Sequence, residues 1–207
     1  MYNCIFTAHC TEAFCDRSCP ILVETSYLLE RNGITMNSPV FSASDSSVQK
    51  MLSILSLSEG KLGVYRTDKG ETTVQSAELL TYCAICKNWR GSRLHCTVYS
   101  LKYSRYLDET KKSWSNPDSE VYEYMKIWAE TAKVLIISNF DYVNFGDFES
   151  QTLLNLIQQR QANGLTTILV SPPIGTLVSS KKSPFFDVLT AMMKANVIKP
   201  LEGGNSV

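Results

Sequence analysis

Four cysteines crowd the start of the chain, and their type and spacing suggest metal chemistry. Cys4, Cys10, Cys15 and Cys19 fall within sixteen residues of a 207-residue sequence that holds seven cysteines. Four thiolates satisfy a tetrahedral zinc ion or the four irons of a [4Fe-4S] cluster. The paired C-x2-C spacing of zinc knuckles is missing, and free buried cysteines are the alternative interpretation. We expect these four residues to bind zinc or a [4Fe-4S] cluster, which would also fold this short segment.

The remaining cysteines follow a different pattern. Cys83 and Cys86 have C-x-x-C spacing, but Cys83 continues an apolar helical stripe that includes Ala77 and Leu80. We therefore predict that this pair packs in the core, as does Cys96 in a predicted strand. The chain does not begin with a basic segment followed by an apolar one, so we expect a cytoplasmic protein without a disulfide framework.

A basic stretch rich in aromatic residues covers residues 87–112. It holds seven basic residues against two acidic ones, in a chain whose formal net charge is zero. The candidate nucleic-acid-binding residues within it are Lys87, Arg90, Arg93, Lys102 and Arg105. The interleaved aromatic residues are Trp89, Tyr99, Tyr103, Tyr106 and Trp114. Basic groups contact phosphates and aromatic rings stack on bases, so the composition fits a single-strand-binding surface. The alternative is a solvated face whose aromatic residues point into the core.

The composition supports a folded α/β protein. Hydrophobic residues make up 44% of the chain and charged ones 19%, enough for a real core. No apolar run approaches the ~18 residues of a membrane span, so we expect no membrane contact.

Strand and helix patterns alternate from about residue 48 onward. The predicted strands are 61–66, 95–101, 134–138, 166–171 and 196–201. The predicted helices are 25–31, 72–89, 119–132, 148–162 and 183–195. Short apolar strands that alternate with helices predict a three-layer α/β domain with a parallel sheet. We divide the chain into a Cys-rich module (1–34), a small polar linker (35–47) and an α/β domain (48–207).

Part of this domain resembles a known family. Residues 132–172 resemble the Walker B to sensor 1 region of the DnaC/DnaI-type helicase loaders and their transposon relatives, which are AAA+ P-loop ATPases. The matching segments are the apolar runs Val134–Ile137 and Thr166–Val170, the helix end Leu156–Arg160 with its arginine, and Gly164. Residues 185–203 are similar to the final helix and strand of that family. The resemblance implies a parallel sheet of the RecA/AAA+ type over residues 48–203, without a lid domain.

The residues with which a P-loop binds nucleotide are replaced. On residues 65–72, Tyr65 takes the place of the first glycine and Glu71 that of the lysine. Lys69 lies on the wrong side of Gly70, and Thr72 keeps the hydroxyl that would contact magnesium. A carboxylate at position 71 would repel phosphates, so we expect no tight nucleotide binding.

The catalytic positions are replaced as well. Ser138 and Asn139 take the places of the two Walker B acids, Asp141 follows two to three residues late, and Pro172 takes the place of the sensor asparagine. Losing all of these together with the lysine removes the electrostatic stabilisation on which phosphoryl transfer depends.

We therefore expect a non-catalytic, AAA+-like accessory protein of DNA replication or mobile-element DNA metabolism, of a kind suited to a phage or mobile element. It would bind a helicase or AAA+ ATPase, or single-stranded DNA, and an oligomer of the chain is compatible with this role. Two alternatives stay open. One is an iron–sulfur sensor or electron-transfer protein on an α/β scaffold, and the other is an active P-loop-like NTPase.

Overall fold

The computed structural model describes residues 20–35, 38–68, 70–88, 97–179 and 183–200, with side chains from Ser26 onward. Four strands form one parallel sheet: β1 (Leu62–Arg66), β2 (Val98–Lys102), β3 (Val134–Ser138) and β4 (Thr166–Ser171). Their order is β1-β4-β3-β2. The predicted parallel sheet is confirmed, and the bounds of β3 and β4 agree with those expected from their apolar runs. The segment predicted as a fifth strand makes a single parallel bridge to β1, between Val197 and Val64.

Seven α-helices lie in the described part of the chain: α1 (Pro20–Arg31), α2 (Asp45–Leu57), α3 (Thr73–Asn88), α4 (Tyr103–Ser113), α5 (Glu120–Thr131), α6 (Asp147–Ala162) and α7 (Pro184–Ala195). No helix in this part is long and apolar enough to cross a membrane. Two of these helices were not predicted, α2 and α4. The serine-rich start of α2 resembles a linker, but Met51, Ile54 and Leu55 are buried along one of its faces. Burial in the tertiary structure thus overrides the weak helix propensity of serine and aspartate there.

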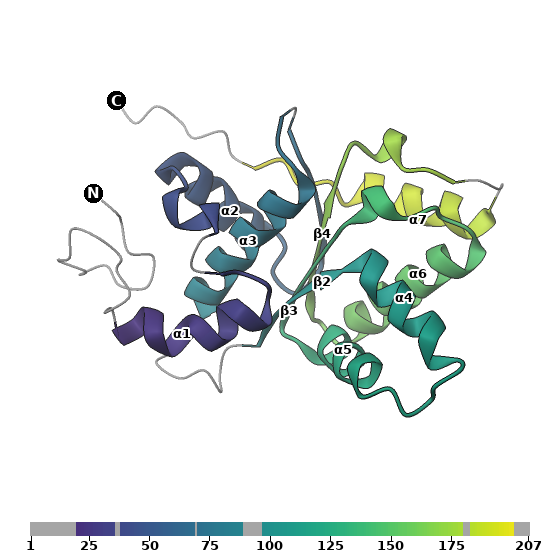
Figure 1. Cartoon of the computed structure of the whole chain (residues 1–207). Coiled ribbons are helices and arrows are strands. Elements are labelled where there is room, and N and C mark those ends of the chain that lie inside the picture. Colours follow the sequence, from purple (N-terminus) through teal and green to yellow (C-terminus); the bar gives the residue numbers. More distant parts are fainter. Residues whose placement is uncertain (1–19, 36–37, 69, 89–96, 180–182, 201–207) are drawn as a thin grey trace.

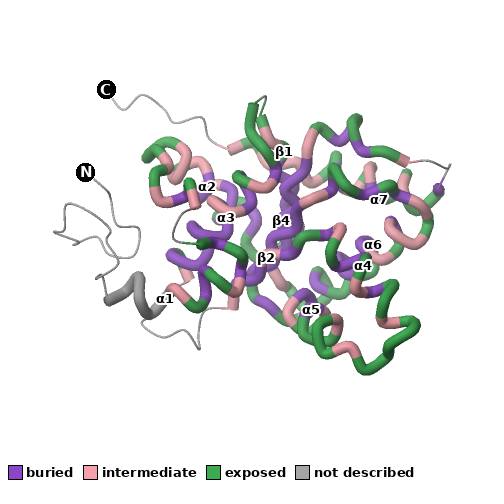
Figure 2. The backbone as a smooth tube through the Cα atoms, viewed as in Figure 1, coloured by how far each residue is buried: buried purple, intermediate pink, exposed green. Residues whose placement is uncertain are grey.

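The helices cover the sheet on both faces, which gives three layers. Helices α1, α2 and α3 lie on one side of the sheet and α4 to α7 on the other (Figure 1). The buried strands run through the centre of the molecule (Figure 2). Alternate strand residues feed two separate cores, because side chains on a strand point to opposite faces. Ile136 and Ile168 join α2 and α3, whereas Leu135 and Leu169 join α4 to α7.

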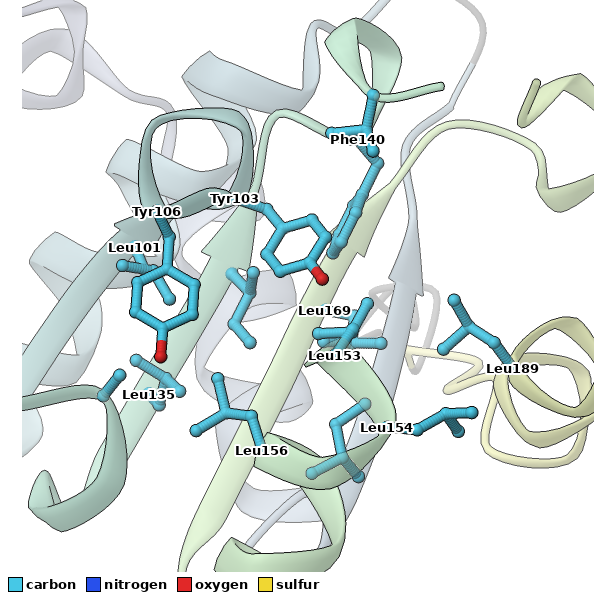
Figure 3. Packing of buried hydrophobic residues seen from close by; sticks show 14 of the residues in the cluster. Leu101, Tyr103, Tyr106, Leu135, Phe140, Leu153, Leu154, Leu156, Leu169 and Leu189 are labelled. Carbon is cyan, nitrogen blue, oxygen red and sulfur yellow. The ribbon is translucent and has the colours of Figure 1, made fainter. Parts of the chain in front are cut away.

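The core beneath α4 to α7 is rich in aromatic residues. Tyr103, Phe140 and Phe145 are fully buried and contact one another, with ring centres 5.7 to 6.4 Å apart. Figure 3 shows Tyr103 and Phe140 above the leucines that α6 directs at the sheet. The hydroxyl of Tyr103 donates to the carbonyl of Glu149 at the start of α6. These contacts fix the start of α4 against the end of β3.

Helix α1 is fastened to the free edge of β2. The Asn32 side chain accepts a hydrogen bond from the Ser100 N–H at 2.6 Å, and Arg31 donates to the Val98 carbonyl at 3.0 Å. Gly33, with φ of 78°, follows the end of the helix in the left-handed conformation that favours glycine. Ile34 just beyond it is buried in the same core as α3. The described residues of the expected N-terminal module therefore pack on the α/β domain, and so does Val40 of the expected linker.

Candidate functional site

The candidate site lies at the carboxyl edge of the sheet, where β1 ends and a loop leads into α3. Parallel α/β folds bind ligands at this edge. A cavity of about 1180 Å³ opens here between α2, the β1–α3 loop and residues 197–200. Of the candidate P-loop residues, Gly70 adopts the left-handed backbone with φ of 97°, which favours glycine, and Lys69 lies outside the described residues.

The Glu71 carboxylate is the centre of a polar cluster in this cavity. One of its oxygens accepts from the Tyr65 hydroxyl at 2.6 Å, the Ser76 hydroxyl at 3.3 Å and the Asp68 N–H at 3.4 Å. Its other oxygen lies 3.0 Å from Lys50 Nζ, which also contacts the Asp68 carboxylate at 2.6 Å. A hydroxyl, a backbone N–H and an ammonium are groups that would also bind a phosphate. The β1–α3 loop therefore places the Glu71 carboxylate against the groups that would otherwise bind a phosphate.

This arrangement stabilises the charged form of Glu71. Burial by itself would raise the pKa of Glu71, but the hydrogen bonds from Tyr65 and Lys50 outweigh it and hold the pKa below its ordinary value. Burial and the hydrogen bond to Glu71 raise the pKa of Tyr65 to about 12. The hydrogen bonds to Asp68, Tyr65 and Glu71 raise the pKa of Lys50 although burial opposes them. At neutral pH the Glu71 carboxyl is thus ionised, the Lys50 amine is charged and the Tyr65 phenol is neutral.

The two threonines at the start of α3, Thr72 and Thr73, make different hydrogen bonds. The Thr72 hydroxyl accepts the N–H of Gln75 at 3.1 Å and so caps the helix. The Thr73 hydroxyl donates to the Asp141 carboxylate at 2.8 Å. In P-loop NTPases a threonine and the Walker B acid share a magnesium ion. Here Thr72, which takes the place of that threonine, caps α3, and it is the neighbouring Thr73 that contacts Asp141.

The ends of β3 and β4 carry no carboxylate. Ser138 is buried, and Asn139 adopts the left-handed backbone with φ of 66°. The Asn139 Oδ1 is buried and has no hydrogen-bond partner in the described structure. The Ser171 hydroxyl donates to the Pro172 carbonyl at 2.8 Å. At the ends of β3 and β4, the described residues supply no pair of acids that could hold magnesium or activate water.

The three predicted nucleic-acid-binding residues that the structure describes do not share one surface. Lys87 lies near the end of α3 and contacts Ser56 just before β1, so it is at the amino edge of the sheet. Lys102 pairs with Ser138 at the carboxyl edge, and Arg105 follows it on α4. Both of these side chains are exposed. Arg90 and Arg93 lie outside the described residues. Of the interleaved aromatic residues in the described part, Tyr99, Tyr103 and Tyr106 are buried and Trp114 is exposed.

The cysteine predictions have different outcomes. Cys4, Cys10, Cys15 and Cys19 lie outside the described residues. Cys83 and Cys86 are buried and form no disulfide, which confirms their expected place in the core. Burial raises the pKa of Cys83 to about 12, so this thiol is unreactive at neutral pH. No group of three metal-binding side chains occurs among the residues that the structure describes.

Sequence reasoning missed the partners of Glu71. Lys50 comes from α2, a helix that was not predicted, and Ser76 lies on the first turns of α3. Tyr65 was noted only as a replaced glycine. No local pattern links Lys50 to a glutamate 21 residues away, so only the fold could identify this ion pair.

Comparison with solved structures identifies the fold. The chain is similar to a replication initiator DnaA bound to AMPPCP and single-stranded DNA, with a TM-score of 0.56 and 9% identity, over 80% of this chain and 50% of that one. It is also similar to domain III of the replication initiation protein DnaA from Thermotoga maritima, with a TM-score of 0.52 and 12% identity, over 78% of this chain and 65% of that one. A DNA replication initiation factor matches with a TM-score of 0.52 and 10% identity, over 83% and 48%.

These likenesses show that the chain shares the α/β fold of these structures. The chain spans less than two thirds of each of the three structures. No protein-family model matches the sequence, and no curated protein matches it.

Proposed function

We propose that this chain is a replication-associated, AAA+-like protein that acts by binding a partner and does not hydrolyse ATP. The main support is the Glu71 cluster. A nucleotide that entered the usual position would bring its phosphates against a carboxylate that three other side chains hold charged and in place. Its fold is that of replication initiators, which favours a role in DNA replication.

The residues that phosphoryl transfer needs are replaced as well as those that bind the nucleotide. Phosphoryl transfer depends on a lysine and magnesium to neutralise the developing charge and on a residue that positions the nucleophile. Glu71, Ser138 and Pro172 occupy those positions here. The chain would therefore act through its surfaces. A replicative helicase, a partner AAA+ ATPase and DNA are the candidate partners, and the sequence resemblance to helicase loaders favours the first.

ATP turnover tests the proposal. We expect purified protein to release phosphate from Mg–ATP only at background rates. We also expect Glu71→Lys alone to leave the rate unchanged, because the acids and the sensor asparagine are still replaced. A Lys50→Ala variant purified in the same way is the control for contaminating ATPases. Loss of the ion pair with Glu71 would alter turnover by this site, but it would not alter turnover by a contaminant. Wild-type turnover at ordinary AAA+ rates that changes in Lys50→Ala would disprove the proposal.

A further inference from the structure

A second pocket runs along the free edge of β2 and gathers three basic side chains from separate parts of the chain. It has a volume of about 390 Å³ and is lined by the end of α1, by β2, α4 and α5. Arg31, Lys102 and Arg105 line it, and Glu30 is the only acidic residue among its described lining residues. None of the three basic groups has a carboxylate within 4.0 Å in the part of the chain that the structure describes. In a protein of zero net charge, this is a local positive site.

Aromatic rings lie beside these charges. The Arg31 guanidinium stacks over Trp128, 4.1 Å from the ring centre, and Trp128 contacts Tyr124 with ring centres 6.2 Å apart. Tyr124 lines the pocket and is 44% exposed, so its ring is accessible to a ligand. Arg31 has one fixed hydrogen bond, to the Val98 carbonyl, while its Nε is buried with no partner in the described structure. A buried donor without a partner is costly, which is a sign of a missing ligand or water.

Tyr99 also lines this pocket, and its ring centre lies 6.3 Å from that of Trp128. Burial raises the pKa of Tyr99 to about 12, with a further contribution from Tyr124, while the charges of Arg105 and Arg31 act in the opposite direction. Both arginines therefore lie close enough to act on one phenol. The phenol therefore stays protonated at neutral pH.

We propose that this pocket binds single-stranded DNA, with Arg31, Lys102 and Arg105 on the phosphates and Tyr124 stacked on a base. Basic groups that follow a backbone beside accessible aromatic rings are the composition of single-strand-binding surfaces. Bases in a duplex are already stacked on one another, so their faces would not reach Tyr124. The inference rests on the proposed function, because it selects DNA from the candidate partners.

Binding of a fluorescein-labelled dT12 to the full-length chain, followed by anisotropy from 50 to 200 mM NaCl, tests the inference. We expect Arg105→Glu to weaken binding about tenfold or more and to lower the salt slope by about 0.7 for each lost phosphate contact. Lys87→Glu is the matched control, because it makes the same charge change at the opposite edge of the sheet. It should alter the affinity less than about twofold. Tyr124→Ala should weaken binding about fivefold or more with an unchanged salt slope, because stacking releases no counterions.

Several results would overturn the inference. Equal losses for Arg105→Glu and Lys87→Glu would mean diffuse attraction without a site. A 12-base-pair duplex that binds as tightly as dT12 would exclude base stacking, and equal competition by a twelve-residue polyglutamate peptide would indicate an acidic protein partner. If wild-type protein binds no dT12 and shows no ATP turnover, this inference fails while the proposed function stands. ATP turnover would refute the proposed function whatever the DNA result.

Discussion

The environment of Glu71 is matched to a carboxylate and not to a phosphate. A P-loop leaves its backbone N–H groups and its lysine open for the ligand. Here the Asp68 N–H and Lys50 already contact Glu71. The substitution at position 71 is therefore not an isolated loss, because residues on α2, β1 and α3 hold the new carboxylate in place.

Acid titration should reveal the contribution of Glu71. Its pKa lies below the ordinary value of 4.5 in the folded state, so it adds stability that is present above pH 4.5 and is lost as the pH falls through the folded pKa. We expect Glu71→Gln to be less stable than wild type by about 1 kcal/mol near neutral pH, because the cluster is partly exposed. Urea unfolding of both proteins from pH 3 to pH 8 measures the difference, which should shrink toward acid pH.

The difference in stability between wild type and Glu71→Gln at each pH also controls for the titration of other groups. Glu149 is the other described carboxylate whose pKa lies below its ordinary value, owing mainly to Lys111, and it titrates equally in both proteins. A stability difference that stays constant from pH 8 to pH 3 would contradict the assigned role of Glu71.

At the scale of elements, one buried arginine joins two helices and a strand. Arg160 on α6 is fully buried and donates to the Ala129 and Ala132 carbonyls at the end of α5, each at 2.8 Å. It also contacts Thr166 and Thr167 of β4 at 2.7 and 2.8 Å. The carbonyls at a helix end lack partners within the helix and favour a cation. Burial lowers the pKa of Arg160 to about 10, so it stays charged at neutral pH.

Replacing Arg160 should loosen this junction. We expect Arg160→Met to lower the free energy of unfolding by about 3 kcal/mol or more, because it leaves three buried carbonyls without donors. Arg160→Lys should lose less, since an ammonium can satisfy part of the set. The exposed Arg105 is the matched control, and Arg105→Met should change stability by less than about 0.5 kcal/mol. Urea denaturation followed by circular dichroism measures all three. Equal effects of Arg160→Met and Arg105→Met would refute the assigned role.

Side chains at the end of α1 likewise fasten that helix to the backbone of β2. A free strand edge exposes backbone groups that can pair with another chain. Arg31 and Asn32 occupy the Val98 carbonyl and the Ser100 N–H on this edge. The same contacts hold Arg31 in the wall of the pocket that Lys102 also lines, so the residues that cover the edge also belong to the proposed DNA site.

At the scale of the whole molecule, the described residues contain no group of three side chains that could hold a metal ion. The metal prediction therefore depends on Cys4, Cys10, Cys15 and Cys19, and it stays a prediction. We expect one zinc ion or one [4Fe-4S] cluster per chain in protein purified without oxygen.

Metal analysis and the absorption spectrum test this. A brown protein that absorbs near ~400 nm would indicate the cluster, and a colourless protein with stoichiometric zinc would indicate a structural site. Cys15→Ser should lose the metal. Cys83→Ser should retain it, because Cys83 is buried in the core with an unreactive thiol. Metal-free wild-type protein, or equal loss in both variants, would contradict the prediction.

The sequence by itself determined the central strands, most helix bounds and the replaced nucleotide-binding residues. The apolar runs of β3 and β4 and the caps around α5 and α7 are local signals, readable from neighbouring residues. Only the tertiary structure decided which distant groups meet. Lys50 reaches Glu71, Arg160 reaches the end of α5, and Arg31 joins Arg105 because the path of the chain brings them together. Local periodicity specifies which face of an element is buried, but not which element covers it.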